Sequence, residues 1–242
     1  MRRSYGVVQP SEPSGILILN MSKINLLIAN ANGNFTNNEV DYITKASIDA
    51  ENFISKHFKF DYEVDVVITA PSFLMKTIPE DGITGRTYNS RLIIVVLDKN
   101  QMKITEEIVY ETICHEMSHS LRWEKLPEYS NTLFKGMILE GLATVLEEEA
   151  LKDKEKSDTQ FFLKTVQDTK EAEYLRMIKI LKKSYHEENY DYDTIFYTGN
   201  NLLPRWAGYR LGYYYVKKYL KTTGRSIEEA TLDSYSLFSN NI

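Results

Sequence analysis

Residues 105–122 read TEEIVYETICHEMSHSLR, and this stretch decides the fold that we expect for the chain. It opens with Thr105, a typical helix N-cap residue, and two glutamates follow where the helix dipole favours negative charge. Apolar residues then recur at helical spacing along one face, at Tyr110, Ile113, Met117 and Leu121. The pattern predicts an amphipathic helix that runs from Thr105 to about Leu121.

The opposite face of this predicted helix carries His115 and His119, with Glu116 beside them. Side chains at positions i and i+4 share a face, with Cβ atoms roughly 6 Å apart, so both imidazoles can bind one Zn²⁺ at about 2.0–2.1 Å. Glu116 points about 100° round the helix from His115, where it can reach a water molecule on the metal. The plainer alternative is a pair of ordinary histidines, buried in a core or exposed.

A catalytic zinc ion needs a third protein ligand and one open position. The next predicted helix, over 132–151, offers Glu140. Small neighbours on that helix would let two helices approach closely, namely Gly136, Ala143 and Thr144. His186 is the rival third ligand, in a polar and tyrosine-rich stretch. The acidic run at 147–149 is interpreted as a solvated helix face.

With these residues in view, the sequence resembles a known group of enzymes. The His-Glu-x-x-His helix, followed about twenty residues later by Glu-Gly-Leu-Ala at 140–143, is similar to the gluzincin clan of zinc metallopeptidases. More narrowly, the chain resembles a bacterial family of predicted zinc-dependent proteases. That family also tends to have an arginine where Arg122 stands and a Gly-Tyr-Arg-x-Gly motif, found here at 208–212.

The resemblance implies a zincin-like α+β fold. We expect a small N-terminal mixed sheet with helices, an active-site helix and a mostly helical C-terminal part. A loose arm over 1–14 would precede a single catalytic domain over 15–242. Within that domain the α/β lobe would cover about 15–122 and the helical lobe about 130–242. Thermolysin-like relatives place an acidic residue that orients a ligand histidine where Thr144 stands, so the identity of that orienting residue stays open.

The resemblance also implies hydrolysis of peptide bonds with one zinc ion per chain. Zinc lowers the pKa of its bound water from about 15.7 toward about 7, and Glu116 would accept the proton as a general base. Tyr209 and Arg210 are the candidates for a donor that stabilises the oxyanion, although Tyr209 also fits an apolar stripe typical of core packing. A peptide or protein substrate would lie along an edge strand, and Leu92–Leu97 is the candidate because it leads into the metal helix.

Two other functions stay open. The same metal and base would serve a zinc hydrolase of a non-peptide amide or an ester. A non-catalytic, zinc-stabilised regulatory or binding domain is the third possibility, but structural zinc sites usually fill the fourth position with Cys or His. Cys114 is the one cysteine of the sequence and is interpreted as a small buried hydrophobe, while His57 and His186 are far away in the chain. This distribution favours an open, catalytic position.

Periodicity along the rest of the chain predicts strands first and helices afterwards, which is typical of an α+β protein. Strands are expected over 62–70 and 91–98, with a loop at 79–85 between them. The capping-box pattern of Ser157 and Gln160 predicts the start of a helix that runs to about Lys183. The stretch over 187–201 is irregular. Further helices are expected over 38–58, 132–151 and 204–220, with a short one from Ser226.

Composition limits the range of partners and compartments. The 242 residues carry a formal net charge of −5 and no block of Lys and Arg, which argues against a nucleic-acid groove. The longest aliphatic runs, over 15–19 and 92–97, are too short to span a bilayer. No apolar segment typical of a signal peptide follows the N-terminal arginines. We therefore expect a cytoplasmic protein without membrane or nucleic-acid partners, whose oligomeric state stays open.

Overall fold

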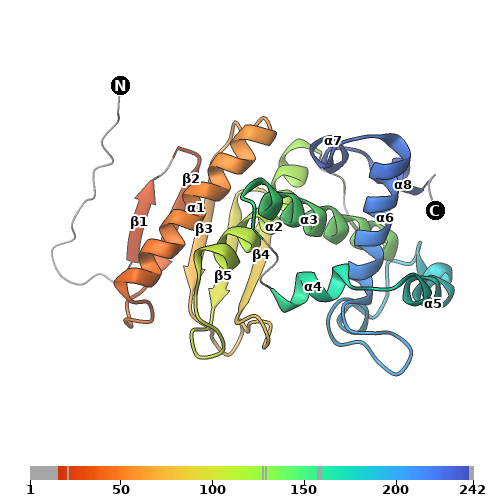
Figure 1. The fold of residues 1–242 in the computed structure, drawn as a ribbon, viewed down its shortest axis with the longest axis horizontal. Helices are drawn as coiled ribbons and strands as arrows, with labels where there is room; N and C mark the ends of the chain where they lie inside the picture. Colours follow the sequence, from red (N-terminus) through yellow and green to blue (C-terminus); the bar gives the residue numbers. More distant parts are fainter. Residues whose placement is uncertain (1–15, 21, 127, 129, 157–159, 240–242) are drawn as a thin grey trace.

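The computed structural model describes residues 16–20, 22–126, 128, 130–156 and 160–239. Within these residues five strands form one mixed sheet in the order β1-β2-β3-β5-β4 (Figure 1). Strands β2, β3 and β5 run parallel, while β1 and β4 lie antiparallel at the two edges. The strands are β1 Ile16–Asn20, β2 Ile24–Ala29, β3 Val64–Thr69, β4 Ile83–Asn89 and β5 Leu92–Leu97.

One face of the sheet forms the core of this half of the molecule. Alternate residues of the central strands are fully buried, as for Val64, Val66 and Ile68 of β3, because strand side chains alternate between two faces. Helix α1, Asn37–His57, and helix α2, Glu106–Lys125, pack on that face (Figure 1). The strands predicted over 62–70 and 91–98 and the helix predicted over 38–58 are thus confirmed.

Strand β4 corrects the sequence prediction of a loop at 79–85. The strand begins at Ile83 and pairs with β5 through a tight connection at Ser90 and Arg91. Only Ile83 and Thr87 of its seven residues are buried, so it lacks the apolar run that marks an inner strand. An edge strand can be polar because one of its sides is not covered by another strand.

Helix α2 begins after Thr105, as predicted, with the threonine hydroxyl accepting a hydrogen bond from the backbone NH of Ile108. Its burial is broader than the predicted single apolar face, since every residue from Ile108 to Arg122 is buried. The cause is its central position, between the sheet, α1 and helix α3, Leu133–Asp153. The face that carries the histidines is therefore covered by other elements instead of facing open solvent.

The C-terminal half is helical, but the predicted helix up to about Lys183 is wrong. It is divided into α4, Phe161–Gln167, and α5, Glu171–Leu181. Ser157 lies outside the described residues, and the side chain of Gln160 makes no capping hydrogen bond. Instead the carboxylate of Asp81, distant in sequence, accepts hydrogen bonds from the first backbone NH groups of α4. A tertiary contact thus replaces the predicted local cap.

The last helices are α6, Ala207–Thr223, α7, Ile227–Thr231, and α8, Tyr235–Ser239. Helix α6 starts three residues later than predicted from Pro204, and Ser226 caps α7 as predicted. The predicted irregular stretch contains a short π-helix, η2, Thr194–Thr198, and a 3-10 turn, η1, Lys182–Ser184, precedes that stretch. The predicted arm over 1–14 lies outside the described residues. Within the described part of the chain, none of the helices is long and apolar enough to cross a bilayer.

Helices α3 and α6 cross at a pair of glycines. A Cβ atom on Gly212 would lie 1.9 Å from the carbonyl oxygen of Met137, and one on Gly141 would lie 2.2 Å from the carbonyl carbon of Gly212. Any larger residue at either position would force the helices apart. The crossing matters for function because Gly141 directly follows Glu140, and Gly212 lies one helical turn after Tyr209.

Candidate metal centre

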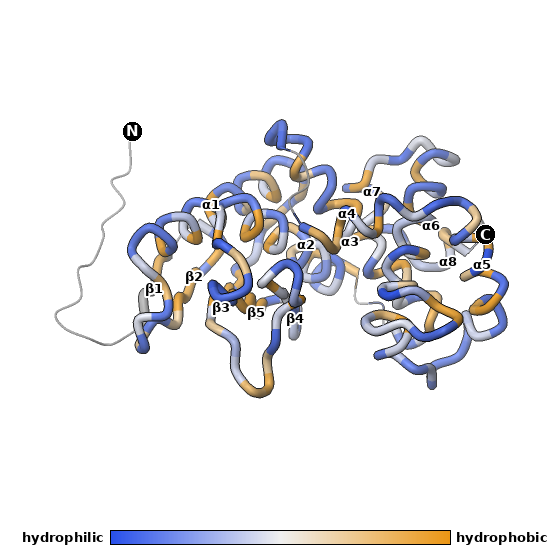
Figure 2. Tube along the Cα trace, turned by 60° about the horizontal axis from the view of Figure 1, so that its bottom comes forward, coloured by the Kyte–Doolittle hydropathy of each residue, from blue (hydrophilic) through white to orange (hydrophobic). Residues whose placement is uncertain are grey.

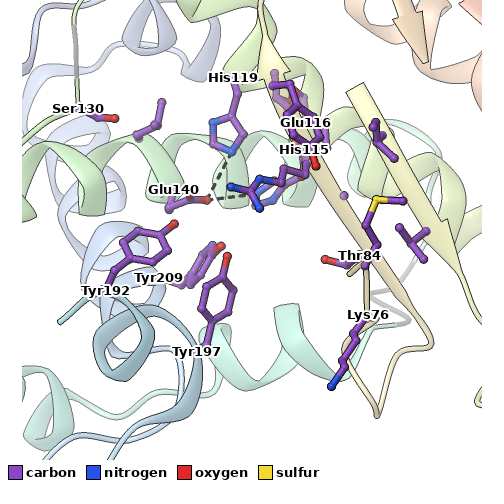
Figure 3. Close-up of a pocket in the computed structure, with 18 of the residues that line it drawn as sticks. Lys76, Thr84, His115, Glu116, His119, Ser130, Glu140, Tyr192, Tyr197 and Tyr209 are labelled. Carbon is purple, nitrogen blue, oxygen red and sulfur yellow. Dashed lines mark hydrogen bonds and ion pairs between the residues drawn. The ribbon is translucent and has the colours of Figure 1, made fainter. Parts of the chain in front are cut away.

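The structure brings together His115 and His119 of α2 with Glu140 of α3 (Figure 3). The Nε2 atoms of the two histidines lie 3.5 Å and 3.4 Å from Oε2 of Glu140. One ligand atom from each of the three residues falls within 4.8 Å of those of the other two. The rival ligand His186 is exposed and does not belong to this group.

The spacing of these atoms suits a zinc ion. Ligands of a tetrahedral ion with bonds of about 2.0–2.1 Å are separated by about 3.3–3.4 Å. The two measured nitrogen-to-oxygen distances, 3.5 Å and 3.4 Å, agree with that edge length. Two imidazoles and one carboxylate are also a usual donor set for catalytic zinc. The three residues therefore form a donor set of the kind and approximate spacing that zinc takes.

Glu147 fixes the orientation of His115 and corrects the interpretation of 147–149 as a solvated face. Its side chain is only 2% exposed, and Nδ1 of His115 donates a 2.9 Å hydrogen bond to it. This bond leaves Nε2 of His115 as the atom that faces Glu140. Glu147 lies seven residues after Glu140, two turns along the same face of α3. Glu147 is thus the acidic residue that orients a ligand histidine, a part that Thr144 cannot take. The Thr144 hydroxyl donates a hydrogen bond to the carbonyl oxygen of Glu140 instead.

The charges of the three groups are strongly coupled. Burial would raise the pKa of Glu140, but the two facing imidazoles outweigh it and lower that pKa to about 2. Burial would lower the pKa of His115, but the carboxylates of Glu140 and Glu147 outweigh it and raise that pKa well above its usual value. The carboxylates therefore favour a cation at this place, whether it is a proton on His115 or a metal ion.

Glu116 lies in the same cleft as the three candidate ligands, and its side chain is almost fully buried. The cleft has a volume of about 450 Å³. Strand β4 forms one wall through Thr84 to Tyr88, and the loop between β3 and β4 continues that wall with Leu74 and Lys76. The tip of this loop is apolar and projects from the molecule (Figure 2), with Leu74 87% exposed. The three candidate ligands, a buried glutamate and the surrounding groove thus share one opening.

The edge strand beside the metal site is β4, which corrects the candidate Leu92–Leu97. That segment is β5, and it pairs with β3 on one side and with β4 on the other. Both of its backbone edges are therefore occupied, which fits the unbroken aliphatic sequence of an inner strand. Within the described residues, strand β4 pairs with β5 along its length and otherwise only bridges Ile83 to Ile78, and its residues from Thr84 to Tyr88 line the cleft.

Three tyrosines line the wall of the cleft opposite β4. Tyr209 of α6 was a sequence candidate, whereas Tyr192 and Tyr197 come from the stretch predicted as irregular (Figure 3). Burial raises the pKa of Tyr209 well above its usual value, so its phenol stays protonated near neutral pH and can donate a hydrogen bond. Tyr192 and Tyr197 are more open to solvent, with 41% and 47% of their surface exposed. Tyr209 also packs against Phe162 and Phe196, with ring centroids 5.0 Å and 5.6 Å away. Tyr209 thus packs among aromatic side chains and also lines the cleft, and its part as an oxyanion donor stays a prediction.

Arg210 and Arg122 do not reach the cleft. The Arg210 guanidinium donates to the carbonyl oxygen of Arg205 and to the hydroxyl of Thr169, away from the metal group. Arg122 is completely buried, and its Nη1 donates to the carbonyl oxygens of Thr231 and Asp233 at 2.8 Å each. These arginines join helices to neighbouring segments. Cys114 is fully buried, and burial raises the pKa of its thiol, as expected of a small core residue.

No curated protein matches the chain. Among solved structures, the chain is similar to an aminopeptidase N family protein from Idiomarina loihiensis, with 12% sequence identity and a TM-score of 0.48. The similarity covers 93% of this chain and 40% of that protein, so the chain spans about two fifths of its length. The family model described as predicted Zn-dependent protease (DUF2268) matches residues 43–239, which include the whole metal group. With most of its sequence covered by that model, the chain belongs to the DUF2268 family of predicted Zn-dependent proteases.

Proposed function

We propose that this protein is a zinc-dependent peptidase with a zincin-like catalytic site, which binds one zinc ion through His115, His119 and Glu140. The observation that carries the proposal is the convergence of three ligand atoms within 4.8 Å of one another, with both histidine-to-Glu140 distances near the edge length of a zinc tetrahedron, inside a cleft that also holds Glu116. With three protein ligands, the fourth position is left for a reacting molecule. A purely structural zinc site would have no use for a buried base beside it.

Each polar side chain of the site has a distinct part in this proposal. Zinc supplies Lewis acidity, which lowers the pKa of water to near 7 and polarises the substrate carbonyl. Glu116 accepts the proton of the attacking water and passes it to the leaving amine. Glu147 holds His115 in the orientation that presents Nε2. Tyr209 donates a hydrogen bond to the oxyanion, a part supported by its place in the cleft and its raised pKa.

The substrate proposed here is an extended peptide. Beyond Ile83, which bridges to Ile78, the second backbone edge of β4 has no strand partner among the described residues, and such an edge can add a peptide strand through main-chain hydrogen bonds. The peptide would then lie between β4 and the tyrosine wall, with its scissile carbonyl at the metal. Leu74, Ile94 and Val96 give the β4 side of the cleft an apolar lining for side chains of the peptide.

Metal analysis combined with a peptide library tests the proposal. We expect the wild-type protein to bind about one zinc ion per chain and to cleave library peptides. Glu116→Gln should keep the zinc and lose the cleavage, whereas His115→Ala and Glu140→Ala should lose both. Glu149→Gln, at a half-exposed residue of α3, is the control that should change neither.

Three results would overturn different parts of the proposal. Wild-type rates of cleavage in Glu116→Gln would remove the general base from the mechanism. A full equivalent of zinc in Glu140→Ala would show that another group completes the metal site. A wild-type protein that binds zinc but cleaves no peptide would contradict the peptidase function itself.

A further inference from the structure

We propose that Thr87 and Gly85 of strand β4 are positioning residues that hold the Glu116 carboxylate in its reactive place. The proposal rests on the proposed function, since it concerns the general base of that reaction. It adds a role for the edge strand, which would align the base as well as the substrate. Neither residue carries a signal in the sequence, where both fall in or beside the segment predicted as a loop.

The first observation is a buried hydrogen bond to the base. The hydroxyl of Thr87 donates to Oε2 of Glu116 at 2.7 Å, and it also lies 3.0 Å from the carbonyl oxygen of Glu116. The two residues are 8% and 6% exposed. A hydroxyl that donates to a carboxylate over about 2.5–2.7 Å makes one of the stronger hydrogen bonds in proteins. A threonine has one hydroxyl proton, so these two acceptors share it.

The second observation is the space that Gly85 leaves. A Cβ atom on Gly85 would lie 2.5 Å from both Cγ and Oε1 of Glu116, closer than any real contact. Gly85 and Thr87 are two residues apart and so point to the same face of β4, toward α2. Thr84 and Arg86 alternate onto the other face, ahead of the register shift between Thr87 and Asn89. On the inner face, then, one residue makes room for the carboxylate and the other binds it.

The combination restricts where the base can sit. A glutamate side chain has three rotatable bonds, and a free one at the mouth of a cleft samples many positions. The Thr87 hydrogen bond fixes one oxygen, and the backbone at Gly85 borders the other. Because the same strand has the free edge next to the cleft, substrate backbone and proton acceptor would be aligned on one element. Misplacement of a reacting group by about 1 Å can cost about 10²-fold in rate.

Kinetics of zinc-loaded variants test the role of Thr87. Thr87→Val removes the hydroxyl at nearly constant volume, and we expect kcat to fall about 10- to 100-fold, as for other partners of active-site groups. KM and zinc content should stay at the wild-type level, and Thr87→Ser should restore most of kcat. Thr231→Val is the matched control, since Thr231 is buried and its hydroxyl donates only to the backbone of α7. The control should lower stability and leave kcat unchanged.

A second measurement does not depend on activity. In a double-mutant cycle on the full chain in saturating zinc, urea unfolding is compared for wild type, Thr87→Val, Glu116→Ala and the double variant. A hydrogen bond to a charged group contributes on the order of 10- to 100-fold in the folding equilibrium constant. We expect Thr87→Val to cost that much in the wild-type background and clearly less after Glu116→Ala. The remaining cost then reports the bond to the carbonyl oxygen at position 116.

Gly85→Ala tests the space independently of the hydrogen bond. Its methyl group should displace the Glu116 carboxylate and lower kcat, with zinc content unchanged. The proposal is overturned if Thr87→Val keeps wild-type kcat, if serine does not restore activity, or if the cycle shows no coupling between positions 87 and 116. Failure of the proposed function would look different. The wild-type protein itself would then cleave no peptide, while the unfolding cycle would still show coupling between positions 87 and 116.

Discussion

Replacement of Glu147 tests the metal site most sharply, because sequence and structure lead to opposite expectations. A glutamate on a solvated helix face could be replaced without effect on zinc affinity. The structure instead has a carboxylate that is 2% exposed and accepts a 2.9 Å hydrogen bond from Nδ1 of His115. Such partners of ligand histidines are typically worth about 10- to 100-fold in metal affinity. At about 1.4 kcal/mol per tenfold, the expected loss of binding free energy is about 1.4–2.8 kcal/mol.

Two substitutions separate the hydrogen bond from the charge. Glu147→Leu removes both at similar volume, so the zinc dissociation constant should rise by the full factor of about 10 to 100. Glu147→Gln keeps an oxygen acceptor for His115 and loses the charge, so its effect should fall between leucine and wild type. Glu149→Leu, on the same helix at a residue with 40% of its side chain exposed, is the matched control.

Competition with a chromophoric zinc chelator at fixed pH gives the four dissociation constants. Circular dichroism of each protein establishes that the variants keep the helical fold. Zinc binding by Glu147→Leu as tight as that of the wild type would refute the orienting role. An equal loss in Glu149→Leu would also refute it, because the effect would then come from total charge and not from the hydrogen bond.

Three more predictions follow from the same geometry. The carboxylates raise the pKa of His115, so zinc must displace a proton from this histidine when it binds. Zinc affinity should therefore rise about tenfold per pH unit until the pH passes that pKa. Equal dissociation constants at pH 6 and pH 8, measured by chelator competition, would contradict this. Tyr209→Phe should lower kcat about 10²–10³-fold with zinc content unchanged, whereas Tyr214→Phe on the same helix should not; similar kinetics for both variants would exclude the oxyanion role. Gly212→Ala would place a Cβ 1.9 Å from the carbonyl oxygen of Met137 and should cost about 1–3 kcal/mol of stability. An unchanged midpoint of urea unfolding would show that α3 and α6 can move apart at little cost.

The raised pKa of His115 also sets the sign of its effect on folding in the zinc-free protein. A group whose pKa is higher in the folded state binds its proton more tightly there than in the unfolded chain. Its contribution to stability is therefore complete below the unfolded value of about 6.5 and is lost as the pH rises through the folded value. Glu140 has the opposite pH dependence, because its pKa is lowered to about 2 in the folded state. Its contribution to folding stability is complete above its unfolded pKa and is lost as the pH falls toward about 2.

Sequence periodicity was sufficient to predict the parts of the fold and site whose geometry depends on neighbouring residues in the chain. Helix α2 follows from its N-cap and its apolar spacing, and the i, i+4 rule brings His115 and His119 to one face without tertiary information. These predictions needed only neighbours within about two helical turns. The small residues around Glu140 were expected to let α3 approach α2, but the backbone contact at Gly141 is with α6, and a Cβ on Gly136 would meet Tyr190 and Phe196.

Sequence reasoning failed where a partner comes from a distant segment. Glu147 looked solvated because it starts an acidic run, although its spacing of seven residues from Glu140 was a usable signal. Strand β4 was missed because an edge strand beside a polar cleft need not be apolar. Tyr192 lies in a stretch without periodicity, so its place opposite β4 depends on how that stretch folds back over α6. In each case the missing information was tertiary.

The glycines explain why the motif alone would not make this site. Gly85 leaves the space that the Glu116 carboxylate fills, and Gly141 and Gly212 let α3 and α6 cross beside Glu140 and Tyr209. A chain that kept the two histidines and the glutamate between them, but carried bulkier residues at these three positions, would keep the motif and lose the alignment. Backbone contact at the metal site is thus as much a requirement as the ligand set. That requirement predicts that substitutions at the glycines impair function while every polar group of the site is still present.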